Sequence, residues 1–119
     1  MSVAHNGRHI ARMNHAPVDP DGTDWVYFSY GDWLRSDESI DSSSALCTGG
    51  TIEAGPTYLG TTTDQDGVSH PETYGIQFSV SSGATLVTIT HRKTTSTSGS
   101  PSLARIDIDH SVSIPVRTL

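Results

Sequence analysis

Apolar and polar side chains alternate along several short segments of the chain, and a period of two residues is typical of β-strands. In the first such segment Val26, Phe28 and Tyr30 share one face, whereas Trp25 and Tyr27 share the other. We therefore predict a strand with one face in the core and a second face that carries aromatic rings.

A bend follows this strand, because Gly31-Asp32 interrupts the alternation. Trp33 and Leu34 come directly after the bend as an apolar pair. We expect this pair to close one end of the core.

The middle of the chain carries shorter signals. Gly49-Gly50 predicts a break, residues 51–53 predict a short strand, and residues 56–60 look irregular. The Asp-Gln-Asp-Gly sequence at 64–67 predicts a turn, as does Asp-Pro-Asp-Gly at 19–22.

Regular alternation returns in the second half of the chain. Residues 76–80 and 86–90 predict two strands joined by a hairpin-type connection at 81–83, and the low-complexity segment 94–101 predicts a loop tip. The longest alternation runs over 106–116, where five of six positions on one face are aliphatic. We predict one long strand there, or two strands joined by a kink.

The pattern as a whole predicts an all-β fold. No segment has a convincing 3.6-residue period, and about seven short strands separated by turns are typical of an antiparallel sandwich. The expected core consists of Val26, Phe28, Tyr30, Trp33, Leu34, Ile40, Phe78, Ile89, Ile106, Ile108, Val112 and Ile114.

Composition excludes several functional classes. Charged residues make up only 17% of the chain and hydrophobic residues 34%, which favours strands and turns over a coiled coil or charge-driven disorder. The formal net charge of −6 leaves no basic surface for nucleic acid or for an anionic membrane. No apolar run approaches the ~20 residues of a membrane helix.

Cys47 is the only cysteine, so the chain can form neither an internal disulfide nor a zinc site of several thiolates. This indicates folding in a reducing compartment, and the N-terminus lacks the apolar region of a secretory signal. Residues 1–17 contain three of the six histidines and few apolar side chains. We predict an extended N-terminal arm over 1–17 and a single domain over 18–119.

Candidate metal sites are weak in the sequence. His5 and His9 have the spacing of two ligands on a helix, but Asn6-Gly7 breaks a helix. The acidic turns at 19–22 and 64–67 resemble the middle of a calcium loop, yet the first and last ligand positions do not fit. We predict ordinary Asx turns at both places.

Catalytic motifs are weak too. The sequence has no GxSxG elbow and no glycine-rich phosphate loop. Asp107 and Asp109 share a predicted face with Arg105, which indicates a solvated surface, whereas His110 falls on the inward face. Cys47 is interpreted as a small buried hydrophobe. We therefore expect no enzymatic activity and no cofactor.

Trp25 and Tyr27 carry the main binding hypothesis. Outward aromatic side chains are enriched at protein interfaces, and they also line carbohydrate sites. In the arm, His9 and Arg12 are the candidate contact residues. The alternative is that loops or the arm itself cover the two rings.

A resemblance to one family rests on residues 28–43. Phe28-Ser29-Tyr30-Gly31-Asp32-Trp33-Leu34, followed by Ser36-Asp37-Glu38-Ser39-Ile40 and Ser42-Ser43, resembles short phage and prophage proteins described as fiber-tail adaptors or neck-associated proteins. Tyr30 stands where the first tryptophan of that family is usual, and Glu38 is an extra residue in the turn. Residues 83–116 resemble the family's final hairpin.

The resemblance implies an immunoglobulin-like sandwich with a non-enzymatic role in the virion, made in the cytoplasm of the bacterial host. Its implied partners are other virion proteins, namely a portal, neck or tail ring or the N-terminus of a fiber, in a symmetric multi-copy assembly. Capsid decoration is a close variant. A carbohydrate- or calcium-dependent binding module is the alternative from a different class.

Overall fold

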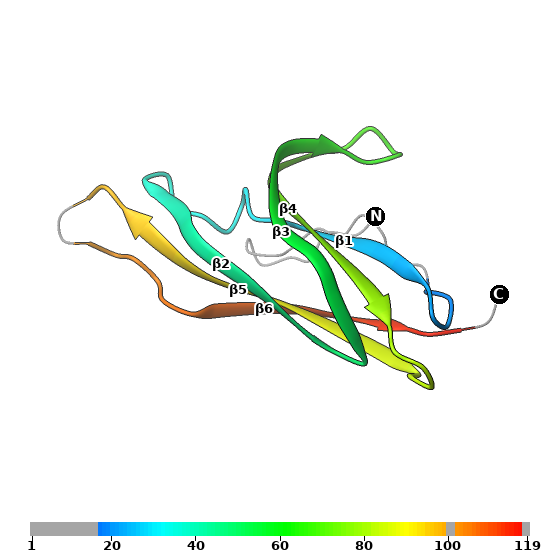
Figure 1. Cartoon of the computed structure of the whole chain (residues 1–119). Coiled ribbons are helices and arrows are strands. Elements are labelled where there is room, and N and C mark those ends of the chain that lie inside the picture. Colours follow the sequence, from blue (N-terminus) through cyan, green and yellow to red (C-terminus); the bar gives the residue numbers. More distant parts are fainter. Residues whose placement is uncertain (1–16, 100–101, 118–119) are drawn as a thin grey trace.

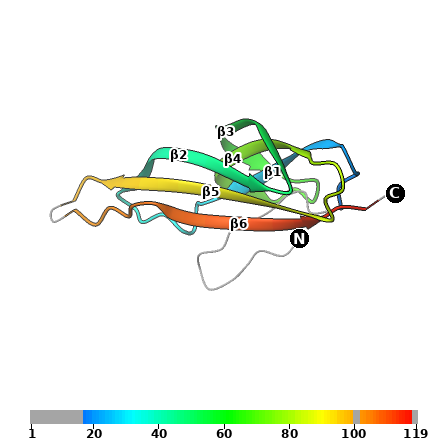
Figure 2. The same ribbon diagram turned by 60° about the horizontal axis from the view of Figure 1, so that its bottom comes forward.

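Two three-stranded antiparallel sheets pack face to face in the computed structural model, which describes residues 17–99 and 102–117 (Figures 1 and 2). One sheet has the order β1-β4-β3 and the other the order β2-β5-β6. The predicted all-β sandwich is therefore confirmed. The strands are β1 (Thr23–Ser29), β2 (Glu38–Thr48), β3 (Gly50–Thr63), β4 (Ser69–Val80), β5 (Leu86–Thr97) and β6 (Ile108–Pro115).

The connections follow the immunoglobulin-like order. Strands β1, β4 and β3 take the places of B, E and D, and strands β2, β5 and β6 take those of C, F and G. Val18 pairs in parallel with Val116 beside β6, where a short first strand would lie. Val18 is already buried in the core between the sheets. The predicted arm, including His9 and Arg12, lies outside the described residues.

The segment 81–83 is not the hairpin connection that the sequence suggested. It leads from β4 in one sheet to β5 in the other. The Ser81 N–H donates to Gly49 O at 3.0 Å, which ties this connection to the neighbouring crossing between the sheets. Crossing the core lets Val80 and Val87 bury their side chains between the sheets, whereas a hairpin would keep both strands in one sheet.

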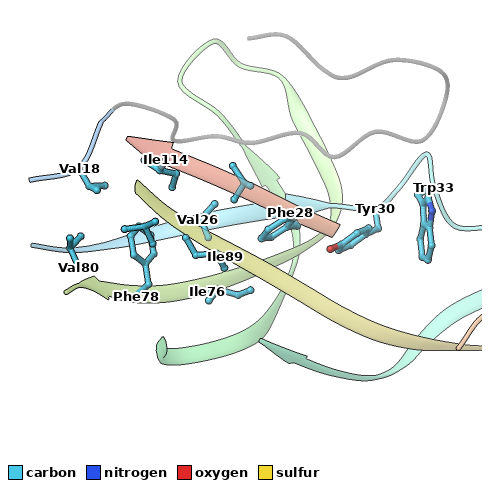
Figure 3. Close-up of a cluster of buried hydrophobic side chains, with 12 residues drawn as sticks. Val18, Val26, Phe28, Tyr30, Trp33, Ile76, Phe78, Val80, Ile89 and Ile114 are labelled. Atoms are coloured by element: carbon cyan, nitrogen blue, oxygen red, sulfur yellow. The ribbon is translucent and has the colours of Figure 1, made fainter. Parts of the chain in front are cut away.

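The core lies between the two sheets as a row of apolar side chains that ends at Tyr30 and Trp33 (Figure 3). Each large aliphatic or aromatic side chain buried there contributes about 1.5–3 kcal/mol to folding. Most of the expected core is buried, while Leu34, Ile40 and Ile108 are half-buried and pack against its edge. The buried members are Val26, Phe28, Tyr30, Trp33, Phe78, Ile89, Val112 and Ile114.

Ile106 is the exception, because its side chain is 71% exposed. The last strand begins only at Ile108, and Asp107 has a left-handed backbone with φ of 53°. A residue in that conformation interrupts the pleat, so the alternation of the sequence no longer determines which way Ile106 faces. Arg105, predicted to be on a solvated face, turns inward instead.

The predicted bend after β1 is present. The N–H groups of Trp33 and Leu34 both donate to Tyr30 O at 3.0 Å. Gly31 is required there, because a Cβ atom would lie 2.3 Å from Cγ of Pro71. The bend places Trp33 over the end of the core.

Strands β3, β4 and β5 are longer than the sequence indicated, and β4 begins at Ser69 rather than near residue 76. Strand β3 includes the apparently irregular residues 56–60, and four register shifts against β4 accommodate them. An edge strand tolerates such bulges because it pairs on one side only. Strand β5 continues to Thr97, into the segment predicted as a loop tip, since β-branched threonines suit an extended backbone.

Residues 17–99 and 102–117 contain no helix that could cross a membrane.

Candidate functional site

The outer face of the β1-β4-β3 sheet carries a group of apolar side chains, which we call the Trp25 patch and define as Trp25, Tyr27 and Leu59. The rings of Trp25 and Tyr27 are stacked with centroids 6.3 Å apart and an interplanar angle of 10°. Both are half-buried, and Leu59 is 41% exposed. Neither ring belongs to the core between the sheets.

Gly75 on β4 allows the three side chains to gather. It pairs with Tyr27 across the sheet. A Cβ atom on Gly75 would lie 3.1 Å from Leu59 Cδ1, 3.2 Å from Tyr27 Cε1 and 3.3 Å from Trp25 Cε3. The apolar side chains therefore lie directly on the backbone of β4, and any larger residue would lift them from the sheet.

A second notable group is buried inside the sandwich, next to the row of core side chains. The Tyr30 hydroxyl and His91 Nδ1 are hydrogen-bonded at 2.5 Å. His110 lies directly opposite His91 on the neighbouring strand, and Lys93 Nζ lies 4.8 Å from the centre of the Tyr30 ring. We call Tyr30, His91, Lys93 and His110 the inner polar cluster.

Burial controls the charge of this cluster. It lowers the pKa of His91 to about 3 and that of His110 to about 4, with the nearby Lys93 ammonium adding to both shifts. Burial also lowers the pKa of Lys93 to about 7, and it raises the pKa of Tyr30 well above its ordinary value. The two imidazoles are therefore neutral at neutral pH.

Lys93 keeps its hydrogen bonds although its side chain is buried. Its Nζ donates to the carbonyl of His91 at 3.0 Å and to that of Ile108 at 3.1 Å. The histidines are less well satisfied, because His91 Nε2 and His110 Nδ1 are buried without a hydrogen-bond partner among the described residues. The expected hydrogen-bonded core histidine at 110 is thus inward-facing, but this ring nitrogen is not bonded.

A buried ion pair lies beside the cluster and ties the β5–β6 connection to β2. The Arg105 guanidinium bonds both carboxylate oxygens of Glu38, and its carbon lies 3.7 Å above the Trp33 ring. The Thr95 hydroxyl also donates to Glu38 at 2.5 Å. These partners lower the pKa of the Glu38 carboxyl to about 2, and the hydrogen bond with Arg105 is the largest cause.

Neither the Trp25 patch nor the inner polar cluster has the side chains of a metal centre. The described residues contain no set of three or more His, Cys, Asp or Glu side chains that could hold a metal ion. The side chains of His91 and Lys93 are buried between the sheets. Their arrangement closes the core with rings and hydrogen bonds.

The acidic turn at 64–67 is an Asx turn, as predicted. The Asp64 carboxylate accepts the N–H groups of Asp66 and Val68 at 2.9 and 3.0 Å. It also contacts His70 Nε2 at 2.8 Å, so its oxygens serve the turn itself.

Cys47 is half-buried, and burial raises the pKa of its thiol, which disfavours a reactive thiolate.

Strand β2 contributes to a polar hollow on the other sheet. The hollow has a volume of about 180 Å³ and is lined by Ser42, Ser43, Ser44, Arg92, Lys93, Thr94 and Asp107. Beside it Arg92 is engaged in a bidentate pair with Asp109, at 2.8 and 3.0 Å. The predicted solvated face thus holds Asp107 and Asp109 with Arg92, and not with Arg105.

Sequence reasoning missed most of the buried polar groups. His91-Arg92-Lys93 looks like a short basic run, but alternation in β5 sends only Arg92 outward. Ile89, His91 and Lys93 are two residues apart along β5 and therefore share one face. This alternation with the apolar Ile89 is the signal that could have placed His91 and Lys93 inside. Glu38 and Arg105 are far apart in the sequence, and no local pattern links them.

Comparison of the chain with protein-family models, with curated proteins and with solved structures found no match.

Proposed function

We propose that this chain is a non-enzymatic assembly module of a bacteriophage virion, which docks on a neck, portal or tail ring and connects fibers or neighbouring rings. The Trp25 patch is the proposed docking surface. The virion context rests on the resemblance of residues 28–43 to phage adaptor proteins, and the docking role rests on the patch.

The observation that carries the proposal is the placement of the patch on the outer face of the sheet over Gly75. Polar side chains at Tyr27 and Leu59 would serve folding as well, since neither side chain belongs to the core between the sheets. Flat aromatic and aliphatic surfaces of this kind are typical of the buried centre of protein interfaces. A partner that covered the patch would remove apolar surface from water, at about 25 cal/mol per Å².

The inner polar cluster supports a structural role. Tyr30, His91 and Lys93 are buried and His110 is half-buried, and the pKa shifts have burial as their main cause. Perturbed pKa values can mark active sites, but here the titratable groups lie between the two sheets and pack against the core. They are used to hold the end of the sandwich together.

The experiment is quantitative mass spectrometry of gradient-purified particles from the source host, with variants of the chain. We expect the wild-type chain at the copy number of a ring. Tyr27→Ser/Leu59→Ser should be incorporated at least tenfold less, and Leu86→Ser, an exposed leucine elsewhere, should be incorporated normally. Thermal unfolding of each purified variant checks that the domain remains folded.

Each part of the proposal fails separately. Absence of the wild-type chain from particles would refute the virion role, and glycan arrays with and without chelator would be the next test. A copy number per particle that matches the capsid shell would indicate capsid decoration. Normal incorporation of the Tyr27/Leu59 variant would refute docking through the patch.

A further inference from the structure

We propose that the connection between β5 and β6 is a second docking surface, in which Leu103 and Ile106 insert into an apolar pocket of a partner protein that carries basic side chains at its rim. This inference does not depend on the Trp25 patch, which lies on the other sheet.

The exposure of two neighbouring large apolar side chains is the first observation. Ile106 is 71% exposed and Leu103 is 55% exposed, more than any other large hydrophobic side chain in residues 17–99 and 102–117. A single exposed leucine is ordinary on a protein surface. Two of them within four residues of one connection, neither belonging to the core, are the apolar side chains on which the proposal rests.

The second observation is that the backbone around these side chains is held firmly. Arg35 Nη1 donates to Leu103 O at 2.8 Å, and Leu103 N donates to the Thr97 hydroxyl at 3.1 Å. Between the two apolar residues, Arg105 N donates to the Thr95 hydroxyl at 2.9 Å, and Arg105 O accepts from Thr95 N at 2.8 Å. The Arg105 side chain continues inward to Glu38.

Neighbouring side chains of the connection therefore point in opposite directions, with Arg105 directed into the protein and Ile106 directed to solvent. Arg105 is directed into the buried ion pair, and Asp107 takes its left-handed conformation while its N–H donates to the Thr94 hydroxyl at 3.2 Å. This arrangement leaves Ile106 facing solvent. A contact residue fixed in this way loses little conformational freedom on binding, and such preorganisation favours affinity.

The position of the connection suits an end-on contact. The domain is elongated, with extents of 51 × 29 × 23 Å. In Figures 1 and 2 the end of β5 and residues 102–107 lie at one end of the domain, and the C-terminal end of β6 lies at the other. A partner could reach this end without touching the outer face of the β1-β4-β3 sheet.

Charge selects the kind of partner. Arg105 and the half-exposed Arg35 share the single carboxylate of Glu38. Together with Asp37 and Asp107, these side chains carry two positive and three negative charges, which leaves a net charge of −1 at this end. The exposed side chains of Asp37 and Asp107 flank the same end, and the whole chain has a net charge of −6. A basic rim complements this surface, whereas a second copy of the chain or an anionic membrane would repel it.

Photocrosslinking in the assembling cell tests the proposal. The full chain carries benzoylphenylalanine at position 106, and a matched chain carries it at position 86, an exposed leucine at the opposite end of β5. We expect position 106 to give an adduct with one other protein, at least tenfold above position 86. The crosslinked peptide should be apolar with flanking Lys or Arg.

Affinity of the purified full chain for that protein provides the second measurement. Ile106→Ser should weaken binding at least tenfold, Ile106→Leu should bind nearly as well as the wild-type chain, and added salt should weaken binding further. Adducts only between two copies, equal adducts from both positions, or no adduct at position 106 would overturn the proposal. Unchanged affinity of Ile106→Ser, or Ile106-dependent binding to phosphatidylglycerol vesicles, would overturn it as well.

Discussion

Replacing Arg105 by methionine would remove the charge that neutralises Glu38 at the base of the β5–β6 connection. Methionine keeps part of the apolar stem over Trp33, so the main loss is electrostatic. The Glu38 side chain is fully buried, and its remaining partners are the Thr95 hydroxyl, the Arg35 N–H at 3.1 Å and the half-exposed Arg35 guanidinium at 3.7 Å. Removing one partner of a buried ion pair costs about 3–5 kcal/mol, because the other charge stays buried.

The pKa of Glu38 gives a second route to this magnitude. Arg105 is the main cause that lowers this pKa from 4.5 to about 2. A shift of that size corresponds to about 3 kcal/mol of stability at neutral pH. Because the folded pKa is the lower one, this stability is present above pH 4.5 and is lost as the pH falls towards 2. We therefore expect Arg105→Met to lower the free energy of unfolding by about 3 kcal/mol at pH 7.

The assay is urea unfolding at pH 7, followed by far-UV circular dichroism. Arg92→Met is the matched control, because Arg92 forms an equally bidentate pair with Asp109 while both side chains are at least 40% exposed. That exposed pair should contribute less than about 1 kcal/mol. Glu38→Gln/Arg105→Met should recover part of the loss, since it leaves no buried charge. Equal losses for Arg105→Met and Arg92→Met would refute the reasoning.

Three further predictions concern the core, a turn and the pH response. Trp33→Ala should lower the free energy of unfolding in urea by about 3–5 kcal/mol, and a loss below about 1 kcal/mol would mean that the ring does not close the core. Gly49→Ala should lower the melting temperature far more than Gly83→Ala. Both glycines have positive φ, but a Cβ atom at Gly49 would lie 2.1 Å from Leu86 O, and one at Gly83 would meet nothing within 4 Å; equal shifts would contradict this. The pKa of His91 in the folded chain is about 3, below its ordinary value of 6.5. As the pH is lowered from 6.5 to 3, the unfolded chain therefore binds a proton more readily than the folded chain, and the free energy of unfolding should decrease. His91→Phe should flatten that fall in acid-unfolding curves, and an unchanged slope would count against a buried neutral imidazole.

Local patterns predicted the parts of the fold that depend on strand parity and turn chemistry. Val26, Phe28 and Tyr30 face the core because alternation in a strand fixes the face of every second residue. The same parity placed Trp25 and Tyr27 on the outer face. Parity failed at Ile106, where Asp107 leaves the strand conformation and the regular pattern no longer applies.

Long-range contacts could not be predicted in this way. Gly75 gives no sign in the sequence that it lies under Trp25, Tyr27 and Leu59, because the four residues come from three different strands. The ion pair of Glu38 and Arg105 is hidden for the same reason. Its two members are 67 positions apart and meet only after the sheets have packed.

The sequence by itself determined that this protein is an all-β sandwich with a bend after the first strand and two rings outside the core. Those features follow from period-two alternation and from glycine and proline turns, which act over a few residues. Only the tertiary structure decided that Lys93 and His91 are buried, that Leu59 joins the Trp25 patch, and that Leu103 and Ile106 are exposed on a hydrogen-bonded connection. The physical reason is that burial depends on which strands become neighbours, and this pairing is a property of the whole chain.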